Sequence, residues 1–173
     1  MPGRKVKRSG RGLSQPIRDY LTSVDLTALK RILVPTDFSD PSQEGLETAI
    51  SFARTFGATL DLVHVALEST YPVPPPIDIA SLPIDIGPAL DRSAAGLAAA
   101  EARVREAGVA CESATLVGRA DQEIVTRART TGAHLIIMGT HGRSGLAHAL
   151  LGSNAERVVQ HAPCPVLIVP KRS

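Results

Sequence analysis

The residues whose types and spacing suggest a ligand site lie in one segment, 139–158. Its sequence, GTHGRSGLAHALLGSNAERV, has glycines at positions 139, 142, 145 and 152 and directly follows an apolar run. Glycine permits positive φ and a close backbone approach, and residues 152–154 precede a predicted helix whose amino end favours an anion. Ser153 could cap that helix and donate its hydroxyl to a phosphate oxygen, and Arg143 supplies a nearby positive charge. The segment therefore predicts a phosphate site.

This segment matches neither of the common phosphate-binding glycine motifs. The GxxxxGK[ST] motif requires a lysine that is absent here, and the GxGxxG motif has a different spacing. The alternative interpretation is structural, with the glycines serving turns and Ser153 serving as a cap. That interpretation accounts for any one of these residues, but less well for four glycines within 14 residues after an apolar run.

The rest of the chain alternates apolar runs with helical patterns. The predicted strands are residues 31–36, 59–66, 110–118, 133–139 and 164–170. The predicted helices are residues 39–57, 90–108, 121–131 and 154–161; the first has Ser39 or Asp40 as its N-cap and Gly57 at its end. Strands that are apolar on both faces and joined by helices indicate a parallel sheet covered on both sides. The predicted fold is α/β, a three-layer α/β/α open sheet of five parallel strands.

Such a sheet predicts where a ligand binds. Ligands of open α/β sheets lie beyond the carboxyl ends of the strands, where the strand order reverses. The loops that follow Pro35, Val65, Val117 and Met138 are therefore the expected site.

Two segments interrupt the alternation. Residues 1–12 hold five basic side chains, three glycines and no acid, and a weak helical pattern follows. We expect residues 1–28 to be a partly disordered basic tail and residues 29–173 to form a single domain. The tail could be an arm for nucleic acid or anionic lipid, but a solvated extension is favoured because no groove-reading motif follows. Residues 68–89 hold six of the 13 prolines and predict a loop, either a lid or partner contact or an inert insertion.

Charge and composition argue against several classes of protein. The chain has 19 basic and 17 acidic residues, but residues 1–12 contribute +5, so residues 13–173 carry a net charge of −3. A mildly acidic domain with few aromatic residues argues against nucleic-acid binding. Two distant cysteines and the lack of an HxxxH pair argue against a disulfide scaffold or a metal site. No apolar run is long enough to span a bilayer and no signal peptide is evident, so we expect no membrane partner and a cytoplasmic location.

Several segments in order resemble a known family. They are RILVPTDFS (31–39), LVHV (62–65), IIMGTHGRSG (136–145), HAPCPVLIVP (161–170) and the spacing Gly139-x2-Gly142-x9-Gly152-Ser153. Together they resemble the ATP-binding branch of the universal stress protein family over about residues 29–171. The resemblance implies a Rossmann-like fold of the adenine nucleotide alpha hydrolase type, and ATP as the ligand, with or without Mg²⁺.

The resemblance also implies roles for individual residues. Asp37, beside Pro35 and Thr36, would bind adenine or ribose edges, whereas the alternative for this acid is a helix cap or a first-turn position. Val65 would offer backbone groups to adenine, and Met138 would lie under the nucleoside. The ribose and phosphates would be lined by Gly139, His141, Gly142, Gly152, Ser153 and Asn154.

Catalysis has less support than binding. Phosphoryl transfer needs metal ligands and a group that orients the nucleophile, and we find neither a second carboxylate near the glycine segment nor a recognisable base. We expect a nucleotide-responsive regulator of stress response, with at most weak ATPase activity. The alternatives are a slow ATPase or nucleotidyl-transfer enzyme on the same fold, and a protein-interaction module without nucleotide. The resemblance implies a homodimer through the last strand, whose apolar edge would otherwise favour aggregation.

Overall fold

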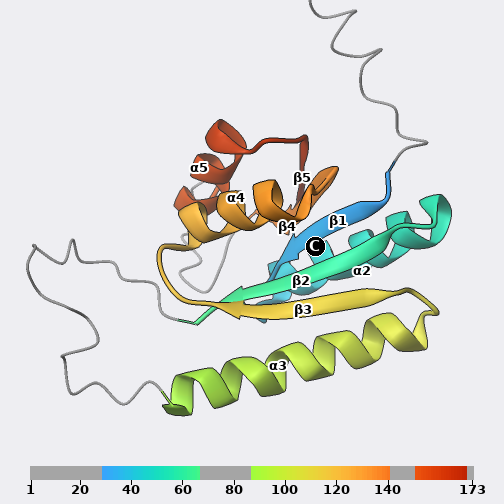
Figure 1. The fold of residues 1–173 in the computed structure, drawn as a ribbon, viewed down its shortest axis with the longest axis horizontal. Coiled ribbons are helices and arrows are strands. Elements are labelled where there is room, and N and C mark those ends of the chain that lie inside the picture. Colours follow the sequence, from blue (N-terminus) through green and yellow to red (C-terminus); the bar gives the residue numbers. More distant parts are fainter. Residues whose placement is uncertain (1–28, 67–86, 141–150, 171–173) are drawn as a thin grey trace, which may run out of the picture.

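The protein forms a five-stranded parallel sheet with helices on both faces (Figure 1), which confirms the predicted fold class. A computed structural model describes residues 29–66, 87–140 and 151–170. The strands are β1 (Arg31–Pro35), β2 (Thr59–Val65), β3 (Cys111–Leu116), β4 (Leu135–Gly139) and β5 (Val166–Val169), in the spatial order β3-β2-β1-β4-β5. The strand order reverses between β1 and β4, so this pair marks the expected ligand position.

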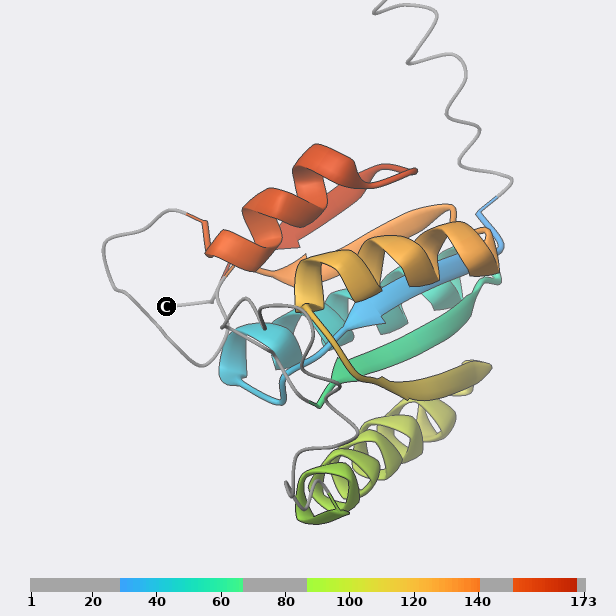
Figure 2. The same cartoon turned by 60° about the vertical axis from the view of Figure 1, so that its left-hand side comes forward.

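Side-chain alternation along the strands divides the core into two layers. Ile32 and Leu62 face helices α2 (Asp40–Phe56) and α3 (Gly87–Glu106), whereas Leu33 and Val63 face α4 (Ala120–Thr131) and α5 (Ser153–His161). Figure 2 shows α4 and α5 on one side of the sheet and α3 on the other. Because both faces are covered, the central strands are almost fully buried, as their apolar runs predict.

Most predicted boundaries agree with the structure to within a few residues. Ser39 is the N-cap of α2, and Gly57 ends this helix with a φ of 65°. Helix α3 begins at Gly87, three residues earlier than predicted, so residues 87–89 of the expected loop 68–89 are helical. The remainder of that loop and the predicted tail lie outside the described residues. No helix in the described part of the chain is long and apolar enough to cross a membrane.

Strand β3 departs from the prediction of strands that are apolar on both faces. It is an edge strand with the sequence CESATL, and none of its residues is fully buried. One neighbour suffices to hold it, because β2 pairs with it along six residues, from Leu60 beside Cys111 to Val65 beside Leu116. Polar residues are therefore tolerated at this edge of the sheet.

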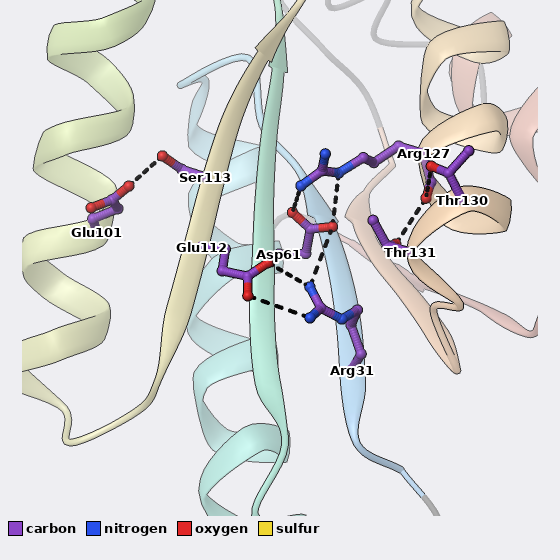
Figure 3. A network of polar contacts seen from close by, with 8 residues as sticks. All are labelled: Arg31, Asp61, Glu101, Glu112, Ser113, Arg127, Thr130 and Thr131. Atoms are coloured by element: carbon purple, nitrogen blue, oxygen red, sulfur yellow. Dashed lines mark hydrogen bonds and ion pairs between the residues drawn. The ribbon is translucent and has the colours of Figure 1, made fainter.

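A charged network crosses three strands near their amino ends (Figure 3). Asp61 of β2 is fully buried, and its two carboxylate oxygens accept hydrogen bonds from Arg127 of α4 at 2.9 and 3.0 Å. Arg31 of β1 lies 4.0 Å from Asp61 and bonds Glu112 of β3 at 2.7 Å. This hydrogen bond lowers the pKa of the Glu112 carboxyl, and donation to the Asp61 carboxylate raises the pKa of Arg127. The network ties α4 to the sheet.

We predict that Arg127→Ala lowers the free energy of unfolding by about 3 kcal/mol, because it leaves a buried carboxylate without its bidentate partner. Arg31→Ala is the matched control and should cost about 1 kcal/mol or less, since its main partner Glu112 is solvent-exposed. Urea unfolding of both variants measures the difference. Equal costs would show that Arg127 is not the main partner of Asp61.

Candidate functional site

One cavity of about 330 Å³ opens at the carboxyl ends of β1, β2 and β4, beside the amino ends of α4 and α5. It lies at the reversal of strand order, and its volume is in the range of small-molecule sites. Nine of the predicted site residues line it: Pro35, Thr36, Asp37, Val65, Met138, Gly139, Gly152, Ser153 and Asn154. The other three, His141, Gly142 and Arg143, lie outside the described residues.

The cavity also has lining residues that sequence reasoning did not single out. These are Ser42, Val63, His64, Ala66, Ala120, Ile124, Thr140 and Ala155. Several of them directly adjoin predicted site residues along a strand or helix, and this adjacency is the signal that could have found them. Ala120 and Ile124 come from the first turns of α4, which follows the loop after Val117 that was expected at the site.

The turn between β1 and α2 holds Asp37 by hydrogen bonds from its neighbour. The N–H of Ser39 donates to Asp37 Oδ1 at 3.1 Å, and the Ser39 hydroxyl donates to the same oxygen at 2.6 Å. Ser39 is the N-cap by position but makes no side-chain cap bond, because its hydroxyl is used by Asp37. Asp37 is therefore neither the cap nor a first-turn acid, and its half-buried carboxylate belongs to the cavity lining.

Hydrogen bonds of the Thr36 and Ser42 side chains stabilise the same turn. The Thr36 hydroxyl donates to Ser42 Oγ at 3.2 Å, and Ser42 Oγ donates to the carbonyl of Ser39 at 2.8 Å. Both side chains are buried, so these bonds are shielded from water and hold the backbone in place.

His64 joins the end of β2 to this turn. Its Nδ1 lies 2.7 Å from the carbonyl oxygen of Thr36, and because a carbonyl only accepts, Nδ1 must carry the proton and donate. The ring is buried, and this hydrogen bond satisfies its Nδ1–H at the end of the sheet. His134 is exposed beside the sheet, just before β4, and its backbone N–H donates to the carbonyl of Arg31 at 3.0 Å.

Helix α5 directs its amino end at the cavity. Its N-cap is Gly152, with a φ of −69°, and the Gly152 carbonyl accepts the N–H of Glu156 at 2.9 Å. The predicted cap role of Ser153 is wrong: Ser153 is the first residue of the helix, and no side chain caps this end. Gly152, Ser153 and Asn154 line the cavity, so the positive end of the helix dipole faces the space where an anion could bind.

Gly139 serves close packing rather than an unusual backbone angle. Neither Gly139 nor Gly152 has a positive φ, contrary to one reason given for glycine at these positions. A Cβ on Gly139 would lie 2.5 Å from the carbonyl oxygen of Pro41, and a Cβ on Gly45 would lie 3.2 Å from the Gly139 nitrogen. Gly139 therefore serves a close backbone approach at the end of β4 rather than a turn, and its backbone is covered by the first turn of α2.

The charged groups of the site are few. Among the described lining residues, Asp37 is the one carboxylate, and no group of three metal-ligating side chains occurs in the described ranges. Burial raises the pKa of the Cys111 and Cys164 thiols, so neither is an activated nucleophile. The arrangement offers one anionic and one electropositive end across a single cavity.

We predict that Gly139→Ala lowers the free energy of unfolding by about 2 kcal/mol, because the added methyl group meets backbone that cannot rotate away. Gly45→Ala should cost less than about 1 kcal/mol, since its contact is longer and alanine favours the helix. Urea unfolding of the two variants measures both. A stable Gly139→Ala protein would rule out the close approach of α2 to β4.

Comparison with known proteins identifies the family. The family model described as "Universal stress protein family" matches residues 28–170. Universal stress protein MJ0531 of Methanocaldococcus jannaschii is 37% identical over 142 residues, which cover 82% of each chain. The solved structure of MJ0577 has a TM-score of 0.72 at 27% identity and covers 84% of this chain and 98% of that one. UspA from Lactobacillus plantarum has a TM-score of 0.68 at 26% identity, covering 82% and 97%. The chain belongs to the universal stress protein family.

Proposed function

We propose that the cavity binds an adenine nucleotide, with ATP as the ligand. The observation that carries this proposal is the placement of Asp37 and the amino end of α5 on one cavity at the reversal of strand order. Phosphates would lie at Gly152–Asn154, where the helix dipole favours negative charge. The base and ribose would lie between Val65 and Asp37, with Met138 beneath. A similar solved structure, 26% identical with a TM-score of 0.63, is a universal stress protein in complex with cAMP, which supports this ligand class.

The role we propose is regulation by nucleotide occupancy in a stress response, rather than catalysis. Hydrolysis needs a metal held near the γ-phosphate and a group that orients water. If Asp37 binds the ribose, no other described lining residue is a carboxylate, so Mg²⁺ would be carried by the phosphates and water. A bound nucleotide would bias the conformation of the loops it touches only through its different affinity for their states.

We also propose that the protein is a cytoplasmic homodimer that pairs through β5. This strand lies at the edge of the sheet, and three of its four residues are partly exposed. The carbonyls of Pro165 and Val169 accept N–H groups of Ile136 and Thr140, respectively. The backbone N–H and C=O groups of successive residues in a strand point to opposite sides. Those of Ile168 therefore point away from β4, toward the open edge. Pairing of this edge with a second copy would satisfy these groups.

Nucleotide binding is tested by thermal unfolding with and without ATP. At 100 times the Kd, ATP should stabilise the protein by about 2.7 kcal/mol, which raises Tm by about 5–10 °C for a domain of this size. Asp37→Ala should weaken binding by about tenfold, as expected for loss of a charged hydrogen-bonding group. Asp91→Ala, which removes an exposed acid of α3 outside the cavity, is the control and should bind as the wild type does.

The two alternatives give different results in the same assays. Sustained phosphate release with ATP and Mg²⁺ that is lost in Asp37→Ala would favour the slow enzyme. The absence of nucleotide after gentle purification, together with no shift in Tm at millimolar ATP, would favour the interaction module and contradict the proposed function.

Dimerisation through β5 is tested with two substitutions at one position. Ile168→Pro removes a side chain and the N–H at the open edge, whereas Ile168→Ala removes the side chain and keeps the N–H. We expect sedimentation to show a monomer for Ile168→Pro and a dimer for Ile168→Ala at the same concentration. A monomeric wild type, or dimers of both variants, would contradict pairing through this edge.

A further inference from the structure

Phe38 has an unusual backbone conformation beside the cavity. Its φ is 65°, and it is the one non-glycine residue with a positive φ in the described ranges. This left-handed conformation is unfavourable for a bulky side chain and persists only where the surroundings enforce it. Phe38 itself does not appear in the cavity lining, although Asp37 before it does.

The Phe38 ring sits between two elements on the far side of the turn. Its centroid lies 4.5 Å from that of His64, with 33° between the ring planes. The other neighbour is Gly96 of α3: a Cβ at this position would lie 2.5 to 2.7 Å from three atoms of the Phe38 ring. Only a glycine leaves room for the ring here. The ring therefore packs against the backbone of α3 and the side of the buried His64, at the edge of the core shared by α2 and α3.

Backbone bonds transmit this ring position to Asp37. The N–H of Phe38 donates to Thr36 Oγ1 at 3.1 Å, and His64 Nδ1 donates to the Thr36 carbonyl. The φ of residue 38 sets the direction of the following residue, Ser39, whose N–H and hydroxyl both bond Asp37 Oδ1. If the ring moved away from Gly96 and His64, the left-handed conformation would lose its support, and the Ser39 donors would turn away from the carboxylate.

We propose that Phe38 is a positioning residue for the nucleotide site, and that Gly96 of α3 makes this possible because its missing side chain leaves room for the ring. The ring, clamped between Gly96 and His64, holds the turn that presents Asp37 to the ligand. Helix α3 contributes no side chain to the described cavity lining, yet through the contact of Gly96 with the Phe38 ring it controls the geometry of the site. The effect on affinity rests on the proposed nucleotide function, whereas the effect on the turn does not.

A double-mutant cycle on Gly96 and Phe38 tests whether the contact between them affects nucleotide affinity. Gly96→Ala should displace the ring and raise the Kd for ATP by about tenfold, within the range of coupling between contacting residues. In a Phe38→Ala background the same substitution should change the Kd less than about twofold, because no ring remains to be displaced. Phe52→Ala is the matched control: it removes a partly buried phenylalanine of the same core, far along α2, and should leave the Kd unchanged.

A measurement without ligand separates this inference from the proposed function. Amide hydrogen exchange of Ser39 in the unliganded protein should become about tenfold faster in Gly96→Ala and Phe38→Ala, but not in Phe52→Ala. If the wild type binds no nucleotide, the proposed function fails and the exchange result still decides whether Phe38 positions the turn. Unchanged exchange in Gly96→Ala, or an equal effect of this substitution with and without the Phe38 ring, would overturn the proposal. Phe38→Leu replaces Phe38→Ala if the latter does not fold.

Discussion

The first turn of α2 lies directly against the backbone of β4, and the site depends on this contact. Gly139 at the end of β4 and Gly45 in α2 lack side chains where the helix and the strand meet. Any Cβ on Gly139 would collide with the Pro41 carbonyl, so the approach is set by backbone against backbone. It brings the turn that carries Asp37 over the reversal of strand order, where α5 also begins. Without it, the two ends of the cavity would lie apart.

Two polar clusters hold the sheet and its helices at opposite ends of the strands. Near the amino ends, buried Asp61 receives Arg127 of α4 and lies beside Arg31. Near the carboxyl ends, His64 and the hydroxyls of Thr36 and Ser42 fasten the turn after β1. The first cluster serves stability, because it is remote from the cavity, but it also orients α4, whose first residues line the cavity. A buried charge thus contributes to the shape of a site that it does not touch.

The contacts of Phe38 hold a group of the proposed ligand site in place before the ligand binds. A nucleotide gains affinity when the groups that meet it are already in place, because less conformational freedom is lost on binding. Asp37 is held by Ser39, Ser39 follows the left-handed Phe38, and the Phe38 ring rests on Gly96 and His64. This chain of contacts links the turn at residues 37–39 to β2 and α3, so helix α3 is coupled to a cavity that it does not line.

The order of strands and helices follows from local sequence. The apolar runs and helical periodicity predict every described element to within a few residues, since burial on two faces leaves a clear pattern. The same pattern, with the rule that ligands bind at strand carboxyl ends, predicts the place of the cavity, whereas nine of its lining residues come from the glycine segment and from the resemblance to the universal stress protein family. Tertiary structure alone decides the reasons for particular residues. Asp61 is one acid in an apolar run, Gly96 is one glycine in an alanine-rich helix, and Ser153 follows the N-cap rather than forming it. The roles of Asp61 and Gly96 depend on partners 66 and 58 positions away, Arg127 and Phe38. The place of Ser153 depends on how the chain enters α5. Periodicity within a segment contains no information about either.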